Sequence, residues 1–196
     1  MPLLNLDKFT IKDELIPAER LASMVEADQT KDLSAQLRDN GYLLLRSVYN
    51  PSDVQAARDE ILKRLAEVGE VAEPISDAIS TGTSDRRLHY PNTKELGAFW
   101  KSVSEGSALR RVINGPEITG VMEKIFGEKV THFSFAWLRA MQAGKASPVH
   151  IDHPYMNRGT KSLLTCWCPI GPVGLDEATL YILCLLYTSP SPRDGR

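Results

Sequence analysis

The chain has 196 residues and a formal net charge of −2, with lysine and arginine scattered along it. A chain of this length buries a sizeable core and suits one domain. The even charge balance argues against a basic surface for nucleic acid or an anionic membrane, so we expect neither partner.

The first residues, MPLLNLDKFTIKDELIP, lack both the basic leader and the unbroken apolar run of a signal peptide. No run reaches the roughly 18 apolar residues of a membrane span. The three cysteines do not have the spacing of a disulfide framework, and reduced thiols fit the cytosol. We therefore expect a cytoplasmic protein.

Helix, strand and helix are predicted in that order near the start of the chain. A short helix carrying Leu33 and Leu37 stops at Gly41, and the β-prone run YLLLRSVY follows it. The sequence NPSD then opens a second helix at Pro51 or Ser52, since proline suits the first helical position.

The second helix has apolar residues at helical spacing, and Gly69 lies just past its end. These residues are Val54, Ala57, Ile61, Leu62 and Leu65. Residues 71–115 have weak periodicity and many breakers, which predicts loop with short helices at a lid or edge. A further amphipathic helix is predicted at PEITGVMEKIFG, with Pro116 in its first turn and Gly127 closing it.

Strands are predicted after this helix. The runs KVTHFSFAWLRAMQ, SPVHIDHPY, KSLLTCWCPIGPV and ATLYIL are short and are separated by Gly, Pro or Asn. Helices early and strands late predict an α+β fold, in a single domain over residues 1–183.

The last residues, CLLYTSPSPRDGR, differ abruptly from the rest. From Cys184 to Asp194 they resemble, codon for codon, one reading frame of a transposase-based sequencing adaptor. We therefore interpret 184–196 as a non-native tail and expect natural sequence past Leu183 to be missing. The alternative is a natural disordered tail, which a Ser/Pro-rich composition permits.

Two histidines flank an aspartate in VHIDHPYMNRG. Because side chains alternate faces along a strand, His150 and Asp152 project to the same side. Together with a second histidine from a distant strand, they would make the 2-His-1-carboxylate triad, which holds Fe(II) and leaves positions open for a 2-oxo acid and O₂. Alone the pattern is weak, and a solvated pair or a histidine cap is the alternative.

Over about residues 33–183 the chain resembles the phytanoyl-CoA dioxygenase family of non-haem iron, 2-oxoglutarate-dependent oxygenases. The runs that carry the resemblance are GYLLLRSVYNPSDVQAARDEIL, WLRAMQAGKASPVHIDHPY and SLLTCWCPIGPV, and the positions typical of the family hold Gly41, Tyr42, Asp53, Arg139, His150, Asp152 and Tyr155. The resemblance implies a double-stranded β-helix barrel, jelly-roll or cupin-like, with the N-terminal helices packed outside it. It also implies Fe(II) and 2-oxoglutarate as cofactors, O₂ as co-substrate and ascorbate as the reductant in an assay.

Carried over by position, His150 and Asp152 are the first two iron ligands. Family members that halogenate have a small residue in place of the carboxylate, so Asp152 favours hydroxylation. Thr165 is the candidate for a hydroxyl against 2-oxoglutarate, and an ordinary β-prone strand residue is the alternative.

Arg139, His153 and Tyr155 are the candidate substrate-binding residues. Arg139 would reach an acidic substrate group, although an ion pair is the commoner role of such an arginine. His153 faces away from the ligands if the strand continues, whereas a turn at Pro154 would bring it near substrate. His89 and His132 precede the strands of the triad and are interpreted as structural or substrate-facing.

The resemblance places the distal histidine ligand and the arginine that pairs with 2-oxoglutarate beyond Leu183. We therefore expect the parent protein to hydroxylate a small organic substrate and the chain as written to be inactive. The alternative is a non-catalytic small-molecule or metal-binding barrel of the same fold. Cys166 and Cys168 share a face by alternation, which suggests zinc, but LLTCWCPI is typical of a buried strand rather than a zinc knuckle.

Overall fold

The computed structural model describes residues 24–140, 158–160 and 162–173, the backbone of 10–11 and 14–15, and the single residues His150, Asp152, Met156, Leu180 and Ile182. Two short strands, β1 (Thr10–Ile11) and β2 (Glu14–Leu15), pair antiparallel. The other assigned elements are helices: α1 (Leu33–Asn40), α2 (Pro51–Ala66), the 3₁₀ helix η3 (Ile75–Asp77), α3 (Arg86–His89), α4 (Thr93–Ser104), α5 (Ser107–Ile113) and α6 (Pro116–Phe126).

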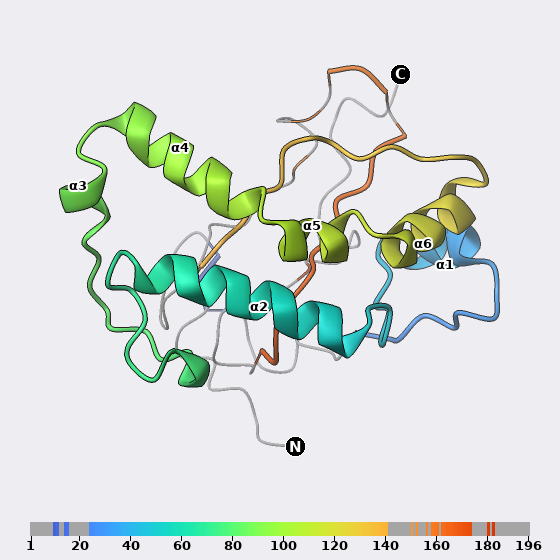
Figure 1. Cartoon of the computed structure of the whole chain (residues 1–196). Coiled ribbons are helices and arrows are strands. Elements are labelled where there is room, and N and C mark those ends of the chain that lie inside the picture. Colours follow the sequence, from blue (N-terminus) through green and yellow to red (C-terminus); the bar gives the residue numbers. More distant parts are fainter. Residues whose placement is uncertain are drawn as a thin grey trace.

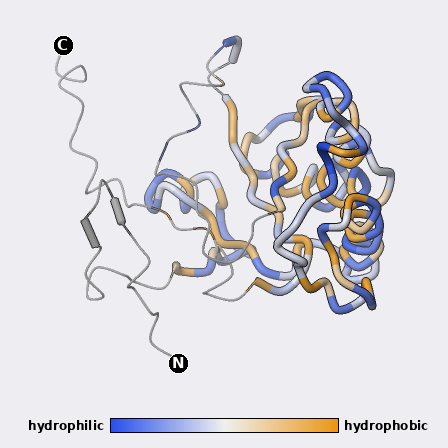
Figure 2. Tube along the Cα trace, turned by 90° about the vertical axis from the view of Figure 1, so that its left-hand side faces the viewer, coloured by the Kyte–Doolittle hydropathy of each residue, from blue (hydrophilic) through white to orange (hydrophobic). Residues whose placement is uncertain are grey.

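The longest helix is α2, and α4, α5 and α6 follow one another along one side of it in the view of Figure 1. Helix α5 packs along α2, and α4 leads into it from the side of α3. Helix α1 lies beside α6 although the two are far apart in the chain. Hydrophobic and hydrophilic stretches alternate along the helical part of the trace (Figure 2), as expected of amphipathic helices that share a core.

The ends of α1 follow from its capping residues. The Asp32 carboxylate accepts hydrogen bonds from the Ser34 and Ala35 amides at 2.8 and 3.2 Å. At the other end Gly41 adopts φ 75° and donates its amide to the Leu37 carbonyl at 2.8 Å. That left-handed conformation suits glycine, so the predicted stop at Gly41 is confirmed.

The predicted start of α2 is confirmed as well. The Asn50 side chain accepts the Ser52 amide at 3.0 Å, and Pro51 occupies the first helical position. The helix ends at Ala66, and Gly69 follows with φ 70°. The predicted third helix is α6, which begins at a proline and ends at a left-handed glycine.

The stretch 71–115 is more helical than the sequence predicted. The short helices η3, α3 and α5 agree with the prediction, but α4 has 12 residues and begins at Thr93. The residue before it, Asn92, caps the helix, because its side chain accepts the Glu95 amide at 2.9 Å. Its Phe99 and Val103 are buried. The interpretation of this stretch as a lid or edge is therefore wrong for α4, because α4 supplies part of the core.

The hydrophobic core lies between α2, α4 and α5. Its buried members are Ala57, Ile61, Leu65, Val68, Phe99, Val103, Leu109 and Val112. Val54 and Leu62, also predicted on the apolar side of α2, are half-buried. The fully buried Ala57 has a side chain small enough for a close approach of a neighbouring helix.

A carboxylate joins α2 to the start of α5. The half-buried Glu60 accepts the Leu109 amide at 3.0 Å and the Ala108 amide at 3.4 Å. The first amides of a helix have no partner within the helix, and its N-terminus favours negative charge. Glu60 therefore satisfies amides that Gly106, the residue before α5, does not cap.

Arg111 on α5 joins the first turns of α2 and α6. Its guanidinium lies 3.1 Å from the Asp53 carboxylate and donates to both Glu117 oxygens, at 2.5 and 2.8 Å. The hydrogen bonds from Arg111 hold the pKa of the Glu117 carboxyl at about 2, below its ordinary 4.5. Two helix N-termini are thereby held to one cation.

We expect this pair to stabilise the fold at neutral pH and to lose that contribution in acid. The lowered pKa means that the Glu117 carboxylate stabilises the fold fully above pH 4.5, and that this contribution is lost as the pH falls toward 2. In urea unfolding, Glu117→Gln should be less stable than wild type at neutral pH, and the gap should narrow near about pH 3. Glu105→Gln is the control, because Glu105 lies 3.8 Å from Lys101 on an exposed face. An equal gap at both pH values would contradict the assignment.

The strands predicted after residue 127 have no assigned counterpart in their described residues, 129–140 and 162–173. In YLLLRSVY a single bridge pairs Leu44 with Glu26, where a strand was predicted. The α+β class and the double-stranded β-helix stay predictions. Phe133, Phe135 and Trp137 are exposed on this part of the chain. Among the described residues, no helix combines the length and apolar character needed to cross a membrane.

Candidate functional site

The predicted metal ligands lie side by side. His150 Nε2 is 3.4 Å from Asp152 Oδ1, and the side chains are 39% and 35% exposed. Both are therefore partly sheltered and reachable from solvent. Alternation along an extended segment predicts this convergence.

This donor pair fits a divalent metal ion. Two ligands about 2.1 Å from an ion and at right angles to each other lie about 3.0 Å apart. The measured 3.4 Å is close to that separation, and an imidazole with a carboxylate is a donor set that Fe(II) accepts. Among the described residues, no group of three or more His, Cys, Asp or Glu side chains is gathered for a metal. The pair therefore offers two possible donors, and its role as a metal site stays a prediction.

His132 is held by α6. Its Nε2 lies 2.8 Å from Thr119 Oγ1, and the Thr119 hydroxyl lies 2.8 Å from the Gly115 carbonyl. A hydroxyl has one proton, which goes to the carbonyl, so Thr119 accepts and His132 Nε2 donates. A protonated Nε2 has no lone pair for a metal. The structural interpretation of His132 fits this bond, and His89 lies exposed at the end of α3.

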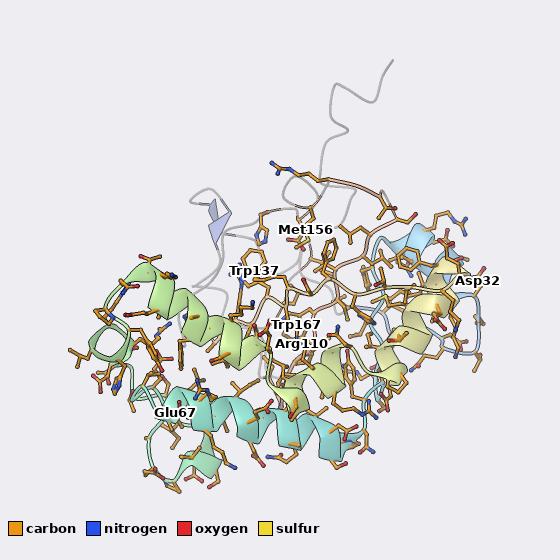
Figure 3. All side chains as sticks on the ribbon, turned by 45° about the horizontal axis from the view of Figure 1, so that its top comes forward. Asp32, Glu67, Arg110, Trp137, Met156 and Trp167 are labelled. Carbon is orange, nitrogen blue, oxygen red and sulfur yellow. The ribbon has the colours of Figure 1, made fainter. Side chains whose placement is uncertain are left out.

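The other predicted site residues are exposed or outside the described part. The Arg139 guanidinium lies 4.4 Å from the centre of the Trp137 ring (Trp137 is labelled in Figure 3), within cation–π range. Thr165 is exposed. His153, Tyr155 and the tail 184–196 lie outside the described residues.

A second polar cluster was not predicted from the sequence. The Tyr49 hydroxyl lies 2.8 Å from Cys168 Sγ, which lies 3.4 Å from Cys166 Sγ. Hydrogen bonds from Cys166 and Tyr49 lower the pKa of the Cys168 thiol to about 7. Burial raises the pKa of the Tyr49 hydroxyl, and the hydrogen bond to Cys168 raises that of the Cys166 thiol. Cys168 is the sulfur that contacts both neighbours, so hydrogen bonds stabilise its thiolate.

The segment carrying these cysteines is held against α2. Ile170 packs on the core, and its carbonyl accepts from Arg58 at 3.4 Å. The shared face of Cys166 and Cys168 was predicted by alternation, but Tyr49 is 119 residues away from Cys168 in sequence. A contact between residues so far apart in sequence cannot be predicted from a local sequence pattern.

A shallow depression of about 290 Å³ lies between α1 and α6. Its lining residues are Ser34, Leu37, Arg38, Ile125, Phe126 and Leu164. None of them is a predicted site residue, so the depression and the predicted metal site are lined by different residues.

Comparison with known proteins gives one match. The family model described as phytanoyl-CoA dioxygenase (PhyH) matches residues 37–183. No curated protein and no solved structure matches the chain.

Proposed function

The chain belongs to the phytanoyl-CoA dioxygenase family, and from this premise we propose that its domain hydroxylates a small organic substrate with Fe(II), 2-oxoglutarate and O₂. Members of the family are generally 2-oxoglutarate-dependent oxygenases and typically use Fe(II). The observation that supports the proposal in this chain is the convergence of His150 and Asp152.

Each of the two residues has a distinct task in this proposal. His150 Nε2 and Asp152 Oδ1 would hold the ion, and the Asp152 carboxylate would offset part of its charge. Bound Fe(II) supplies the activation of O₂ that couples oxidation of the 2-oxo acid to oxidation of the substrate. Both side chains are partly exposed, so small reactants can reach them from solvent.

The finer assignments belong to the same proposal. We assign Thr165 to the 2-oxo acid, and Arg139, His153 and Tyr155 to the substrate. The contact with Trp137 orients the Arg139 guanidinium. A guanidinium held in this way is suited to a carboxylate or phosphate group of a substrate.

Replacing Asp152 by alanine should weaken Fe(II) binding at least about tenfold, since even changes in groups that support metal ligands cost this much. The measurement is anaerobic titration of the full-length parent protein with Fe(II). The matched control is Asp39→Ala, which removes an exposed carboxylate on α1. Equal affinities of Asp152→Ala and wild type would remove Asp152 from the site.

Turnover separates an oxygenase from a metal-binding module. Fe(II)-dependent succinate formation from 2-oxoglutarate by the full-length parent protein, absent in its Asp152→Ala variant, would support the oxygenase. Fe(II) binding that needs Asp152, in a full-length parent that forms no succinate, would favour a non-catalytic barrel.

A further inference from the structure

The two free thiols of the described part of the chain form a contact pair. Cys166 Sγ and Cys168 Sγ lie 3.4 Å apart, and the Tyr49 hydroxyl lies 2.8 Å from Cys168 Sγ. Cys166 is exposed and Cys168 is partly covered. One sulfur therefore faces solvent, while the other lies between a thiol and a phenol.

The spacing of the two residues along the chain is compatible with a disulfide bond between them. Two residues of extended chain advance about 6.6 Å, and disulfides span Cα separations of up to about 6.8 Å. The sulfurs need to close from 3.4 Å to about 2.05 Å, and because the Cβ atoms of a disulfide lie only about 3.8 Å apart, the backbone from Cys166 to Cys168 has to bend as well. A disulfide at the long end of the range is also easily reduced.

We propose that Cys166 and Cys168 are a reversible redox pair whose substrate class is peroxides, with Cys168 attacking first, Cys166 closing the disulfide, and Tyr49 holding the attacking sulfur. The pair is independent of the proposed iron site, since it uses neither His150 nor Asp152.

The first step takes place at Cys168. Its thiolate attacks one peroxide oxygen, so an S–O bond forms and the O–O bond breaks. The sulfur loses two electrons and becomes a sulfenic acid, while the other oxygen leaves with a proton as water or an alcohol. The hydrogen bonds from Tyr49 and Cys166 stabilise the thiolate that this step requires.

The second step takes place at Cys166. Its sulfur attacks Cys168, the S–S bond forms, the S–O bond breaks, and water leaves with the Cys166 proton. The sum is two thiols and one hydrogen peroxide giving one disulfide and two waters. Because Cys166 lies two residues from Cys168, it reacts before a second peroxide can oxidise Cys168 further.

The test uses the chain with Cys184→Ser, so that only the pair remains. After treatment with stoichiometric hydrogen peroxide and removal of the excess, the intact mass should be lower by two hydrogen atoms. Dithiothreitol should restore the original mass, and the chain should not become cross-linked to a second copy. A mass increase by oxygen atoms without disulfide, or a cross-linked dimer, would overturn the proposal.

Three variants assign the roles. Cys166→Ser should stop at the sulfenic acid or go on to higher oxides, and Cys168→Ser should react several-fold more slowly than wild type. Tyr49→Phe keeps the ring and removes only the hydroxyl, so it should slow oxidation of the native pair several-fold, while urea-denatured wild type and variant react alike. Equal native rates for Tyr49→Phe and wild type would remove Tyr49 from the site.

Discussion

Replacement of Phe99 by alanine is expected to lower the free energy of unfolding by about 3–5 kcal/mol. The Phe99 side chain is 3% exposed and lies in the core formed by α2, α4 and α5. Its ring stacks on Tyr90 with centroids 4.7 Å apart and meets Trp100 edge-on at 5.3 Å. The Arg64 guanidinium lies 5.2 Å from the ring centre. The substitution removes all of these contacts and leaves a cavity.

Urea unfolding followed by circular dichroism measures this loss. Phe99→Leu should cost much less than Phe99→Ala, because it keeps most of the buried volume. Leu88→Ala is the exposed control, since Leu88 is 79% exposed, and it should change stability by no more than about 0.5 kcal/mol. A cost for Phe99→Ala as small as that of the control would show that the core does not depend on α4.

Replacement of Glu60 by alanine is expected to cost about 1–3 kcal/mol. The two amides at the start of α5 lose their acceptor, and a helix N-terminus loses a negative charge that stabilises it. Glu60→Gln keeps one acceptor oxygen and should lie between wild type and Glu60→Ala. Equal stability of all three in urea unfolding would mean that water replaces the carboxylate without cost.

A pair of glycine substitutions tests the same contact from the other side. A Cβ on Gly106 would lie 2.2 Å from Glu60 Oε2, so Gly106→Ala must displace the carboxylate. Gly97, inside α4, has nothing within 4 Å of its Cβ position. Gly97→Ala should therefore leave stability unchanged or raise it by up to about 1 kcal/mol, whereas Gly106→Ala should lower it. The reverse order would contradict the geometry at α5.

The ends of three helices were predictable from sequence because their signals are local. The stop of α1 at Gly41 and the start of α2 at Pro51 need only the residues beside them. Helix α4 was missed although Leu96, Phe99, Trp100 and Val103 have helical spacing. The Gly, Pro and Asn residues on both sides of α4, together with Gly97 inside it, favoured a loop and outweighed the helical spacing.

The contacts that join the helices were not predictable in the same way. The cation at Arg111 bridges Asp53 and Glu117, and Glu60 reaches Leu109. These pairings depend on how α2, α5 and α6 pack. A single sequence contains no periodic signal for them.

The candidate site likewise has one part that was predictable from local sequence and one part that depends on tertiary structure. The proximity of His150 and Asp152 was predictable, because two residues so close in sequence bring their side chains together if the chain is extended. A third ligand from a distant strand depends on tertiary structure, as does the approach of Tyr49 to Cys168. The barrel itself stays a prediction for the same reason, since a strand in a barrel is defined by its partners.

The packing of α1 against α6 has a consequence for the order of folding. The two helices lie at opposite ends of the helical region, so their contact closes a loop that contains α2 to α5. Such a closure costs chain entropy before any contact repays it, whereas α2 and α5 gain their core from a shorter loop. Docking of α1 therefore completes the helical region rather than nucleating it, and α1 can detach while the core beneath α4 and α5 stays formed.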